Sequence, residues 1–276
     1  MIAQIALRDA IARLNDHAIA SAPRDARVLL SYAMGIDPSR LTLELSQTLD
    51  QDVLDRFQNV IDQRCAHKPV SRILGYRDFW GRRFRITADV LDPRGDTETL
   101  VQAVVTQPAT RVLDLGTGSG ILAVTLAAEW PAAQVVASDI SPDALDVARH
   151  NAQALGVQDR VSCVQSDWFD QIDGRYDLIV SNPPYITDRE MAELQPDVLH
   201  FDPKIALTPG GDGLHPYRVI SAQAAAFLNA GGRIAVEIGW QQGPVVAELF
   251  RAAGFRDVAV LTDLDGKDRV VVANWP

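Results

Sequence analysis

Hydrophobic positions in the first part of the chain follow a helical period. Apolar side chains recur three and four positions apart, as at Val28 and Tyr32, which is the spacing of one helix face. Residues 21–25 and 37–39 combine proline with Ser or Asp, the residue types that begin helices. We therefore expect a small helical domain over residues 1–74.

The pattern then changes to short runs of aromatic and branched residues. Residues 76–80 and 84–86 flank Gly81, and two such runs around a glycine are typical of a β-hairpin. We expect residues 75–92 to form a hairpin linker and residues 93–276 to form the main domain.

After Pro108, strand patterns alternate with helix patterns, which is typical of a parallel sheet covered on both faces. Strands are expected at residues 111–115, 134–139, 161–165, 176–181 and 233–238, with helices at 119–129, 142–155, 217–228 and 242–253. Two further β-rich runs, residues 257–261 and 269–273, are joined by a loop with Asp265 and Gly266, which predicts a hairpin. The expected fold is α/β and Rossmann-like, a mostly parallel seven-stranded sheet with an antiparallel C-terminal strand.

Composition agrees with a globular protein of two domains. The chain has 276 residues, of which 47% are hydrophobic and 22% are charged, the balance of a soluble protein. No apolar stretch approaches the roughly 20 residues of a membrane span, and residues 1–5 lack the features of a secretory signal, so we expect a cytoplasmic protein. Cys65 and Cys163 lie far apart with no histidine pair beside them, which predicts neither a disulfide nor a metal site.

The net charge of -10 opposes tight binding to nucleic acid, because sequence-independent affinity for phosphates comes from Lys and Arg. Residues 82–85 hold the densest group of arginines. They are either a local basic patch or the solvated surface of the hairpin. We expect no stable contact with nucleic acid.

A glycine-rich loop follows the first strand of the main domain. Its glycines stand at alternate positions where a buried strand turns into a helix, and Asp114 precedes them by two residues. Glycine there permits positive φ and lets backbone N–H groups approach a ligand. The loop reads G-x-G-x-G instead of the G-x-G-x-x-G of nicotinamide-binding proteins, and an acid can offset the ammonium and sulfonium of S-adenosylmethionine directly or through water. The residues expected to bind this cofactor are Asp114, Gly116, Thr117, Gly118, Ser119 and Gly120.

Acidic residues also end the next two strands. Asp139 stands about 20 residues beyond the loop, where an acid accepts hydrogen bonds from ribose hydroxyls, although it could instead cap the helix that starts at residue 142. Asp167 could accept from the adenine amino group while Trp168 covers the ring. An aromatic residue after a strand is, however, more often part of the core.

The tetrad Asn182, Pro183, Pro184 and Tyr185 follows the strand at residues 176–181. An amide or aryl amino nitrogen is a poor nucleophile because its lone pair is delocalised. The Asn182 side-chain oxygen, beside the cofactor, and the Pro183 carbonyl could accept its two N–H bonds and orient the lone pair. The prolines hold the preceding residues extended, and Tyr185 would cover the flat face of the acceptor. Alone, the tetrad could be a turn without a functional role. Together with the glycine-rich loop, it predicts an S-adenosylmethionine-dependent methyltransferase acting on a planar nitrogen.

These motifs resemble the protein-(glutamine-N5) methyltransferases that modify peptide chain release factors. Besides the loop and the tetrad, the resemblance covers residues 23–30, 69–75, 79–81, 206–207 and 210–214. It implies a class I methyltransferase domain and methylation of the glutamine in the Gly-Gly-Gln motif of a release factor, in support of translation termination. It also implies that the helical domain helps to hold the release factor.

One segment departs from the family pattern. The family usually has an apolar residue and Pro-Arg-Pro before acid-Thr-Glu, whereas residues 91–98 carry Asp92 and Gly95. A glycine in place of proline loosens the segment. Roles for Arg94 and Glu98 are therefore left open, and residues 96–98 could simply start the next helix.

Three other functions share parts of this pattern. An adenine-N6 methyltransferase of DNA or RNA presents similar donors, but it would need a recognition domain and a basic surface. An enzyme that methylates a glutamine of a ribosomal protein would share the catalytic residues, and only the N-terminal domain argues against it. A non-enzymatic cofactor-binding regulator has no need of both prolines and the tyrosine. A monomer is expected, although nothing in the sequence specifies the oligomeric state.

Overall fold

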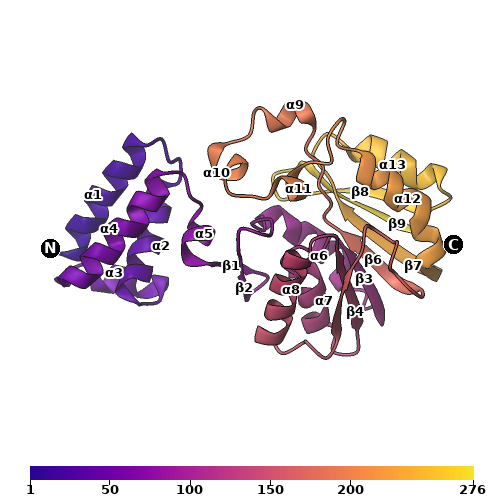
Figure 1. Ribbon diagram of the computed structural model, residues 1–276, viewed down its shortest axis with the longest axis horizontal. Coiled ribbons are helices and arrows are strands. Elements are labelled where there is room, and N and C mark those ends of the chain that lie inside the picture. Colours follow the sequence, from indigo (N-terminus) through magenta and orange to yellow (C-terminus); the bar gives the residue numbers. More distant parts are fainter. The chain divides into compact units, whose positions relative to one another are not determined.

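The computed structural model describes all residues, 1–276, and forms two compact units (Figure 1). The first unit consists of Met1–Gly75 together with Gln195–Phe201, and the second of Tyr76–Leu194 with Asp202–Pro276. No helix in either unit is both long enough and apolar enough to cross a membrane.

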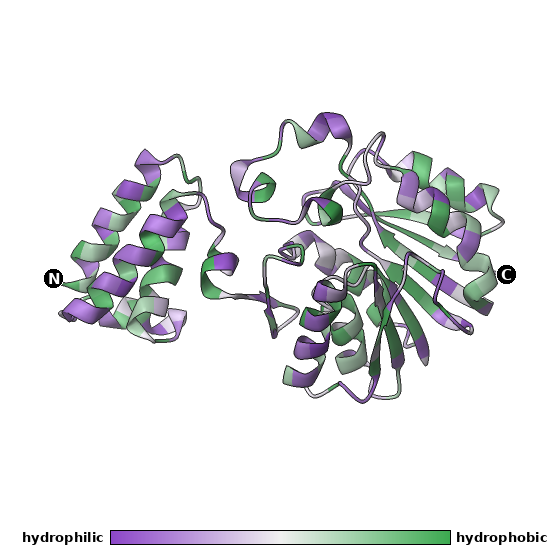
Figure 2. Ribbon diagram, viewed as in Figure 1, coloured by the Kyte–Doolittle hydropathy of each residue, from purple (hydrophilic) through white to green (hydrophobic).

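The first unit is a small helical bundle. Its elements are α1 (Ala3–Asp16), α2 (Ala22–Met34), the 3-10 turn η1 (Pro38–Arg40), α3 (Leu41–Glu44), α4 (Gln51–Cys65), α5 (Val70–Leu74) and, from the later segment, α10 (Pro196–Leu199). Leu14, Leu29 and Ile61 are buried where α1, α2 and α4 pack together. The alternating stripes along these helices in Figure 2 are the pattern expected of amphipathic helices.

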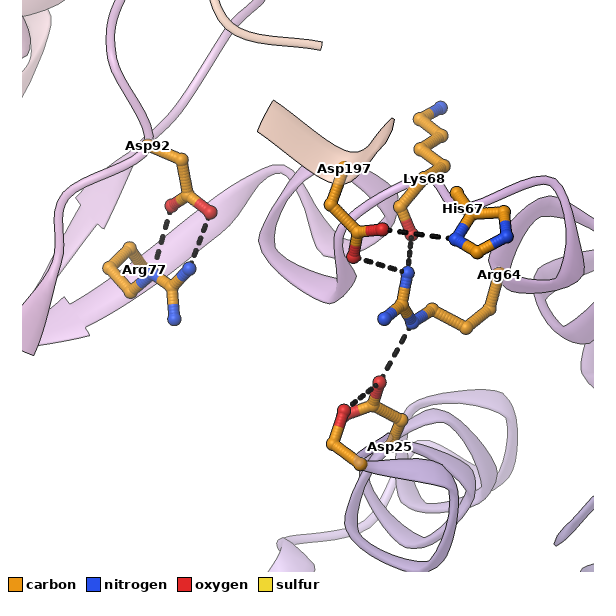
Figure 3. A network of polar contacts seen from close by, with 8 residues as sticks. Asp25, Arg64, His67, Lys68, Arg77, Asp92 and Asp197 are labelled. Carbon is orange, nitrogen blue, oxygen red and sulfur yellow. Dashed lines mark hydrogen bonds and ion pairs between the residues drawn. The ribbon is translucent and has the colours of Figure 1, made fainter. Parts of the chain in front are cut away.

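A buried arginine joins the Gln195–Phe201 segment to this bundle (Figure 3). Arg64 lies on α4 and is only 5% exposed. Its Nε donates to Asp25 Oδ2 at 2.7 Å, and its Nη1 pairs with Asp197 Oδ2 at 2.9 Å. His67 Nδ1 lies 3.1 Å from the other oxygen of Asp197. Because a buried charge needs partners, α10 is fixed to the helical unit through these pairs.

The second unit is built on a seven-stranded sheet. The strands are β3 (Arg111–Leu115), β4 (Gln134–Asp139), β5 (Val161–Gln165), β6 (Tyr176–Ser181), β7 (Leu228–Glu237), β8 (Arg256–Thr262) and β9 (Asp268–Asn274), in the order β5-β4-β3-β6-β7-β9-β8. Only β9 is antiparallel, and it pairs with both β7 and β8. This confirms the predicted class, with the last strand inserted between the two before it.

Helices cover both faces of this sheet (Figure 1). The helices α6 (Glu98–Val105), α7 (Ile121–Glu129) and α8 (Pro142–Ala154) pack on one face, and α12 (His215–Phe227) and α13 (Gly243–Ala252) on the other. Shorter elements are η2 (Gly95–Thr97), α9 (Asp188–Met191) and α11 (Lys204–Leu207). Each face of the sheet thereby has its own hydrophobic core.

The strand order reverses between β3 and β6. After β3 the chain runs outward through β4 and β5 and returns to place β6 on the other side of β3. The two strands end in register, because Leu115 pairs with Ser181, and Ser181 Oγ donates to the Leu115 carbonyl at 2.7 Å. Ligands of open parallel sheets bind at such a reversal, beyond the carboxyl ends of the strands.

The segment before the sheet contains the expected hairpin. Strands β1 (Tyr76–Phe79) and β2 (Arg82–Arg85) pair antiparallel. Trp80 and Gly81 both have positive φ, which is the conformation of the two-residue turns that suit the twist of a hairpin. Strand β7 differs from its prediction, since it begins at Leu228, which pairs with Tyr176 of β6.

Candidate active site

A cavity lies at the carboxyl ends of β3, β4, β5 and β6, where the strand order reverses. The predicted site residues that line it are Gly116, Thr117, Gly118, Ser119, Asp139, Asp167, Trp168, Asn182 and Pro184. Residues that the sequence did not single out also line it, including Asp89, Val90, Leu91, Pro93, Thr97, Ser138, Ile140, Ile205 and Ala206. The structure thus brings the glycine loop and the start of the tetrad to one cavity.

The loop after β3 depends on glycine at two points of its lining. Gly116 and Gly118 have φ of 67° and 54°, in the left-handed region that other residues avoid. A Cβ at either position would meet no atom within 4 Å, so both positions border open space. Their backbone can therefore approach a ligand closely.

Gly120 has a different place from the one predicted for it. It does not line the cavity but stands at the N-terminus of α7, with φ of 80°. A Cβ there would lie 3.1 Å from the Ala148 Cα on α8. The third glycine therefore serves the close packing of α7 against α8.

Asp114 lies beneath the loop, is 1% exposed and does not line the cavity. Its Oδ2 accepts from Thr117 Oγ1 at 2.6 Å and from the Ala123 N–H at 3.1 Å. Its Oδ1 is buried without a hydrogen-bond partner, and burial raises the pKa of this carboxyl to about 7. An unsatisfied buried acceptor is costly. Because Asp114 does not line the cavity, this oxygen suits a cationic group that it reaches through the loop or through a water.

Asp139 ties the end of β4 to the glycine loop. Its Oδ2 accepts from the Gly118 N–H at 2.8 Å and its Oδ1 from the Ser141 N–H at 3.0 Å, while burial raises its pKa. The alternative in which Asp139 caps α8 is wrong, because Ser141 is the N-cap and accepts from the Ala144 N–H at 3.2 Å. A carboxylate has about four acceptor positions, so Asp139 keeps capacity to accept from hydroxyls in the cavity.

Asp167 and Trp168 both line the same cavity beyond β5. Trp168 has φ of 48°, an uncommon conformation for a bulky residue. Its ring also packs against the core beneath the sheet. The two predicted alternatives, core residue and cavity wall, therefore both describe Trp168.

Only part of the tetrad lines the cavity. Asn182 and Pro184 line the cavity, whereas Pro183 is buried. Asn182 Nδ2 donates to Thr97 Oγ1 at 3.3 Å, which orients the amide and leaves its oxygen free to accept. Tyr185 does not line this cavity, in contrast to its predicted place across the acceptor, because its ring is held elsewhere.

Tyr185 is fixed by contacts from β7 and the following turn. Its hydroxyl lies 3.4 Å from Glu237 Oε1, and its carbonyl accepts from Gln242 Nε2 at 3.1 Å. A Cβ at Gly213 would lie 2.2 Å from that carbonyl oxygen, so only glycine fits there. Burial raises the pKa of Tyr185.

The ring of Tyr185 borders a second hollow. Its lining includes Tyr185, Thr187, Glu190, Leu194, Asp212, Leu214, Trp240, Gln242, Val245 and Arg269. Trp240 at its rim is 54% exposed. The tetrad thus contributes to both, with Asn182 and Pro184 lining the cavity at the strand ends and Tyr185 lining this hollow.

Glu237 is a buried acid that the sequence reasoning missed. It ends β7, beside the end of β6, and is 2% exposed. Burial raises the pKa of its carboxyl to about 7, against lowering contributions from Thr97 and Arg269. The available signal was an acid inside the apolar run at residues 234–238, since burying a carboxyl is unfavourable without a purpose.

The segment that departs from the family pattern is held by ion pairs within the second unit. Asp92 is fully buried and forms a salt bridge with Arg77 (Figure 3). Arg94 pairs with Asp202 at 2.8 Å, and Asp202 also accepts from the Asp92 N–H at 3.0 Å. The unusual Asp92 is thus compensated by its neighbours. Gly95 has no positive φ and begins η2.

Two of the three arginines at residues 82–85 form ion pairs within the chain. Arg82 forms a salt bridge with Glu129 at 2.8 Å, and Arg83 with Asp78 at 2.9 Å. The guanidinium of Arg83 also lies over the Tyr76 ring at 3.7 Å. Of the two predicted alternatives, a local basic patch and a solvated hairpin surface, these pairs favour the second.

Comparison with known proteins places both units. Residues 6–75 match the family model of the PrmC N-terminal domain, and residues 87–213 match that of the methyltransferase small domain. A protein of Cereibacter sphaeroides named release factor glutamine methyltransferase is 53% identical over 276 residues, covering 100% of this chain and 99% of that protein. One of the same name from Rhodospirillum rubrum is 43% identical over 253 residues, covering 91% of this chain and 78% of that protein.

Among solved structures, a methyltransferase from Pyrococcus furiosus superposes with a TM-score of 0.54. It is 15% identical, and the match covers 71% of this chain and 89% of that one. Such a likeness supports the fold of the catalytic unit, while the sequence relatives extend over both units.

Proposed function

Because this chain belongs to the family of release factor glutamine methyltransferases, we propose that it methylates the side-chain amide nitrogen, N5, of the glutamine in the Gly-Gly-Gln motif of peptide chain release factors. The observation that carries this proposal is the placement of Asn182. Its amide is oriented by Thr97 and lines the cavity beside the glycine loop. An acceptor amide can therefore meet a fixed hydrogen-bond acceptor next to the methyl donor.

S-adenosylmethionine, the methyl donor of such enzymes, supplies an electrophilic methyl group on a sulfonium. The backbone at Gly116 and Gly118 would border the methionine part, and Asp139 would accept from the ribose hydroxyls. Asp167 and Trp168 would contact the adenine. Asp114 lies beneath the loop, so we propose that its unpartnered Oδ1 acts on the ammonium through the loop or a water.

Asn182 Oδ1 lines the cavity and would accept one N–H bond of the glutamine amide. Pro183 is buried, so its carbonyl would accept the second N–H bond only once the bound amide reaches past the lining. These bonds favour pyramidal character at nitrogen and direct its lone pair toward the donor. As the N–C bond forms, the S–C bond of the donor breaks and S-adenosylhomocysteine leaves. No strong base is required, because the nitrogen becomes acidic only as the methyl arrives and then loses its proton to water. Tyr185 does not act as that base, since burial raises its pKa and keeps the phenol neutral. Its role is to hold the tetrad.

We propose that the helical residues 1–74 recognise the release factor, that residues 75–92 are the linker and that residues 93–276 are the catalytic domain. The helical unit also includes Gln195–Phe201, a segment that follows the tetrad. The release factor would therefore be held by a unit to which the chain beyond the active site also contributes. A monomer would suffice for this arrangement.

Labelled cofactor and purified release factors test the proposed function. Label should enter the wild-type factor and be absent when the tripeptide glutamine is replaced by asparagine, and mass spectrometry should place the methyl on the glutamine side chain. Label that survives the replacement contradicts the proposed acceptor. Purified ribosomal proteins and adenine-containing oligonucleotides in parallel reactions test the two competing acceptors.

Asn182→Ala tests the tetrad in the same assay. It should lower kcat on the order of a hundred-fold, the usual cost of losing one positioned hydrogen-bonding group, while calorimetry shows cofactor binding retained. Gln153→Ala removes an exposed amide on α8 and should change neither. Joint loss of binding and rate in Asn182→Ala means that Asn182 is structural.

A further inference from the structure

Glu237 stands behind the tetrad, and the chemistry proposed above does not use it. It follows Val236, which pairs with Ser181 at the end of β6, so Glu237 and Asn182 extend from neighbouring strand ends. Its Oε1 lies 3.4 Å from the Tyr185 hydroxyl. Its Oε2 is buried and makes no hydrogen bond. A buried carboxyl with an unpaired oxygen is unfavourable for the fold.

Thr97 connects this carboxyl with Asn182. The Thr97 hydroxyl accepts from Asn182 Nδ2 at 3.3 Å. It also faces Glu237 and lowers the pKa of that acid, as a hydrogen bond to the ionised form does. A hydroxyl has one proton to donate, so Thr97 can give it either to the carboxyl or to Asn182. When Thr97 donates its hydrogen bond to Glu237, it can only accept from Asn182, and when it donates to Asn182, it can only accept from Glu237.

We propose that Glu237 is a positioning residue for methyl transfer. As a carboxylate it accepts a hydrogen bond from the Thr97 hydroxyl, and this bond keeps the Asn182 amide oxygen directed toward the acceptor nitrogen. This inference rests on the proposed function, and it adds a residue and a control of orientation to it. In the ionised state the chain of donors would run from Asn182 through Thr97 to Glu237, and its first link, the hydrogen bond from Asn182 Nδ2 to Thr97 Oγ1, is present in the structure.

Protonation reverses this chain of donors. A neutral Glu237 donates to Thr97, and Thr97 then turns its proton toward Asn182. The Asn182 amide then rotates, so that its oxygen accepts from Thr97 and its NH2 group faces the cavity. Two donor groups then face each other at the acceptor site, since the glutamine amide also offers N–H bonds. Transfer is slowed although both substrates can still bind.

The surroundings of Glu237 place this change near neutral pH. Burial raises its pKa to about 7, Arg269 on β9 lowers it and Asp96 on η2 raises it. The two facing phenols, Tyr185 and Tyr217, have raised pKa values and remain neutral donors. Glu237 is therefore the group in this cluster whose charge changes as the pH passes neutrality.

Glu237→Gln tests the proposal through the pH profile of transfer to purified release factor. In the wild type, kcat should rise with pH with a midpoint near 7. In Glu237→Gln the rise should disappear, with kcat on the order of ten-fold lower at alkaline pH and the release-factor KM little changed. Thr97→Val should reproduce this loss and Thr97→Ser should restore the wild-type profile, because serine keeps the hydroxyl.

Tyr217→Phe is the matched control, since it removes a buried hydroxyl that donates to the Glu237 carbonyl at 2.9 Å and leaves the carboxyl in place. It should lose stability and keep the shape of the profile. An unchanged profile in Glu237→Gln, or the same flattening in Tyr217→Phe, overturns the proposed role.

A second measurement needs no release factor. In the 15N NMR spectrum of the chain alone, the Asn182 side-chain NH2 resonance, assigned by its loss in Asn182→Ala, should titrate with the midpoint of kcat. It should not titrate in Glu237→Gln. A titration that persists in that variant, or its absence from the wild type, contradicts the inference. If the resonance titrates as expected while no label reaches the release factor, the proposed function fails and the relay stands.

Discussion

The Gly118 N–H donates to Asp139 Oδ2 at 2.8 Å, so the glycine loop and the end of β4 form one rigid edge of the cavity. A second bond, from the Thr117 N–H to the Ser138 carbonyl at 2.8 Å, links the same two neighbouring strand ends. Asp139 therefore has two tasks, to hold the loop and to accept from the ribose hydroxyls proposed above. The carboxylate performs both because it offers several acceptor positions.

Asp139→Asn should weaken cofactor binding on the order of ten-fold or more, because a charge-assisted acceptor is lost both for the loop and for the ribose. Isothermal calorimetry with S-adenosylhomocysteine measures the change. Asp143→Asn, an exposed neighbour in the first turn of α8, should bind as the wild type does. Equal affinities in the two variants would remove Asp139 from the binding site.

Gly120→Ala should destabilise the fold by about 1–3 kcal/mol more than Gly35→Ala. Both glycines have positive φ, 80° and 66°, so alanine is strained at each. Only at position 120 would the new Cβ approach another helix, 3.1 Å from the Ala148 Cα, while at position 35 it meets nothing within 4 Å. Urea unfolding measures both, and equal losses would mean that the α7–α8 contact can relax.

The stability of the fold should fall as the pH rises toward and past neutrality. Burial raises the pKa of Asp114 from 3.8 to about 7 and that of Glu237 from 4.5 to about 7. Between the ordinary pKa values of 3.8 and 4.5 and the raised value of about 7, the folded chain therefore binds more protons than the unfolded chain. This stabilisation is complete below the unfolded pKa values and is lost as the pH passes 7.

Urea unfolding at several pH values between about 5 and 9 checks this sign. Asp114→Asn and Glu237→Gln should each flatten the dependence, since the substituted amides do not titrate. A fold whose stability rises over this range would contradict the assignment of raised pKa values to both acids.

Arg64→Ala should destabilise the helical unit by about 3–5 kcal/mol, because it leaves two carboxylates without their buried partner. The same variant should increase hydrogen exchange in Gln195–Phe201, which Arg64 binds through Asp197 at 2.9 Å. Arg8→Ala removes an exposed pair with Asp9 and should be near neutral. Unchanged exchange in the segment would show that other contacts hold α10.

Local pattern sufficed for much of the catalytic unit. Strands β3, β4, β5 and β6 occupy the predicted residues, because each is a short apolar run that ends at a clear polar or glycine position. The alternation of strands and helices predicts the parallel sheet, while the reversal of strand order that brings the loop and Asn182 together comes from the structure.

Features that depend on residues distant in the sequence could not be predicted from the local pattern. Glu237 matters because β7 lies beside β6, which residues 234–238 by themselves cannot reveal. The sequence pattern predicts a ligand contact for Gly120 because spacing does not show which glycine faces another helix. The tetrad pattern predicts that Tyr185 covers the acceptor, whereas in the structure its hydroxyl lies against Glu237, a carboxyl more than 50 positions later in the chain.

The assignment of Gln195–Phe201 to the helical unit gives the molecule an unusual connectivity. The chain passes from one unit to the other at residues 75–76, again at 194–195 and once more at 201–202. Deleting the first 75 residues would thus remove the partners of Asp197 and leave a short loose excursion just beyond the tetrad. A shortened chain that begins at residue 76 would therefore lack the contacts that hold α10, and a cut that keeps this segment in place must retain the helical unit.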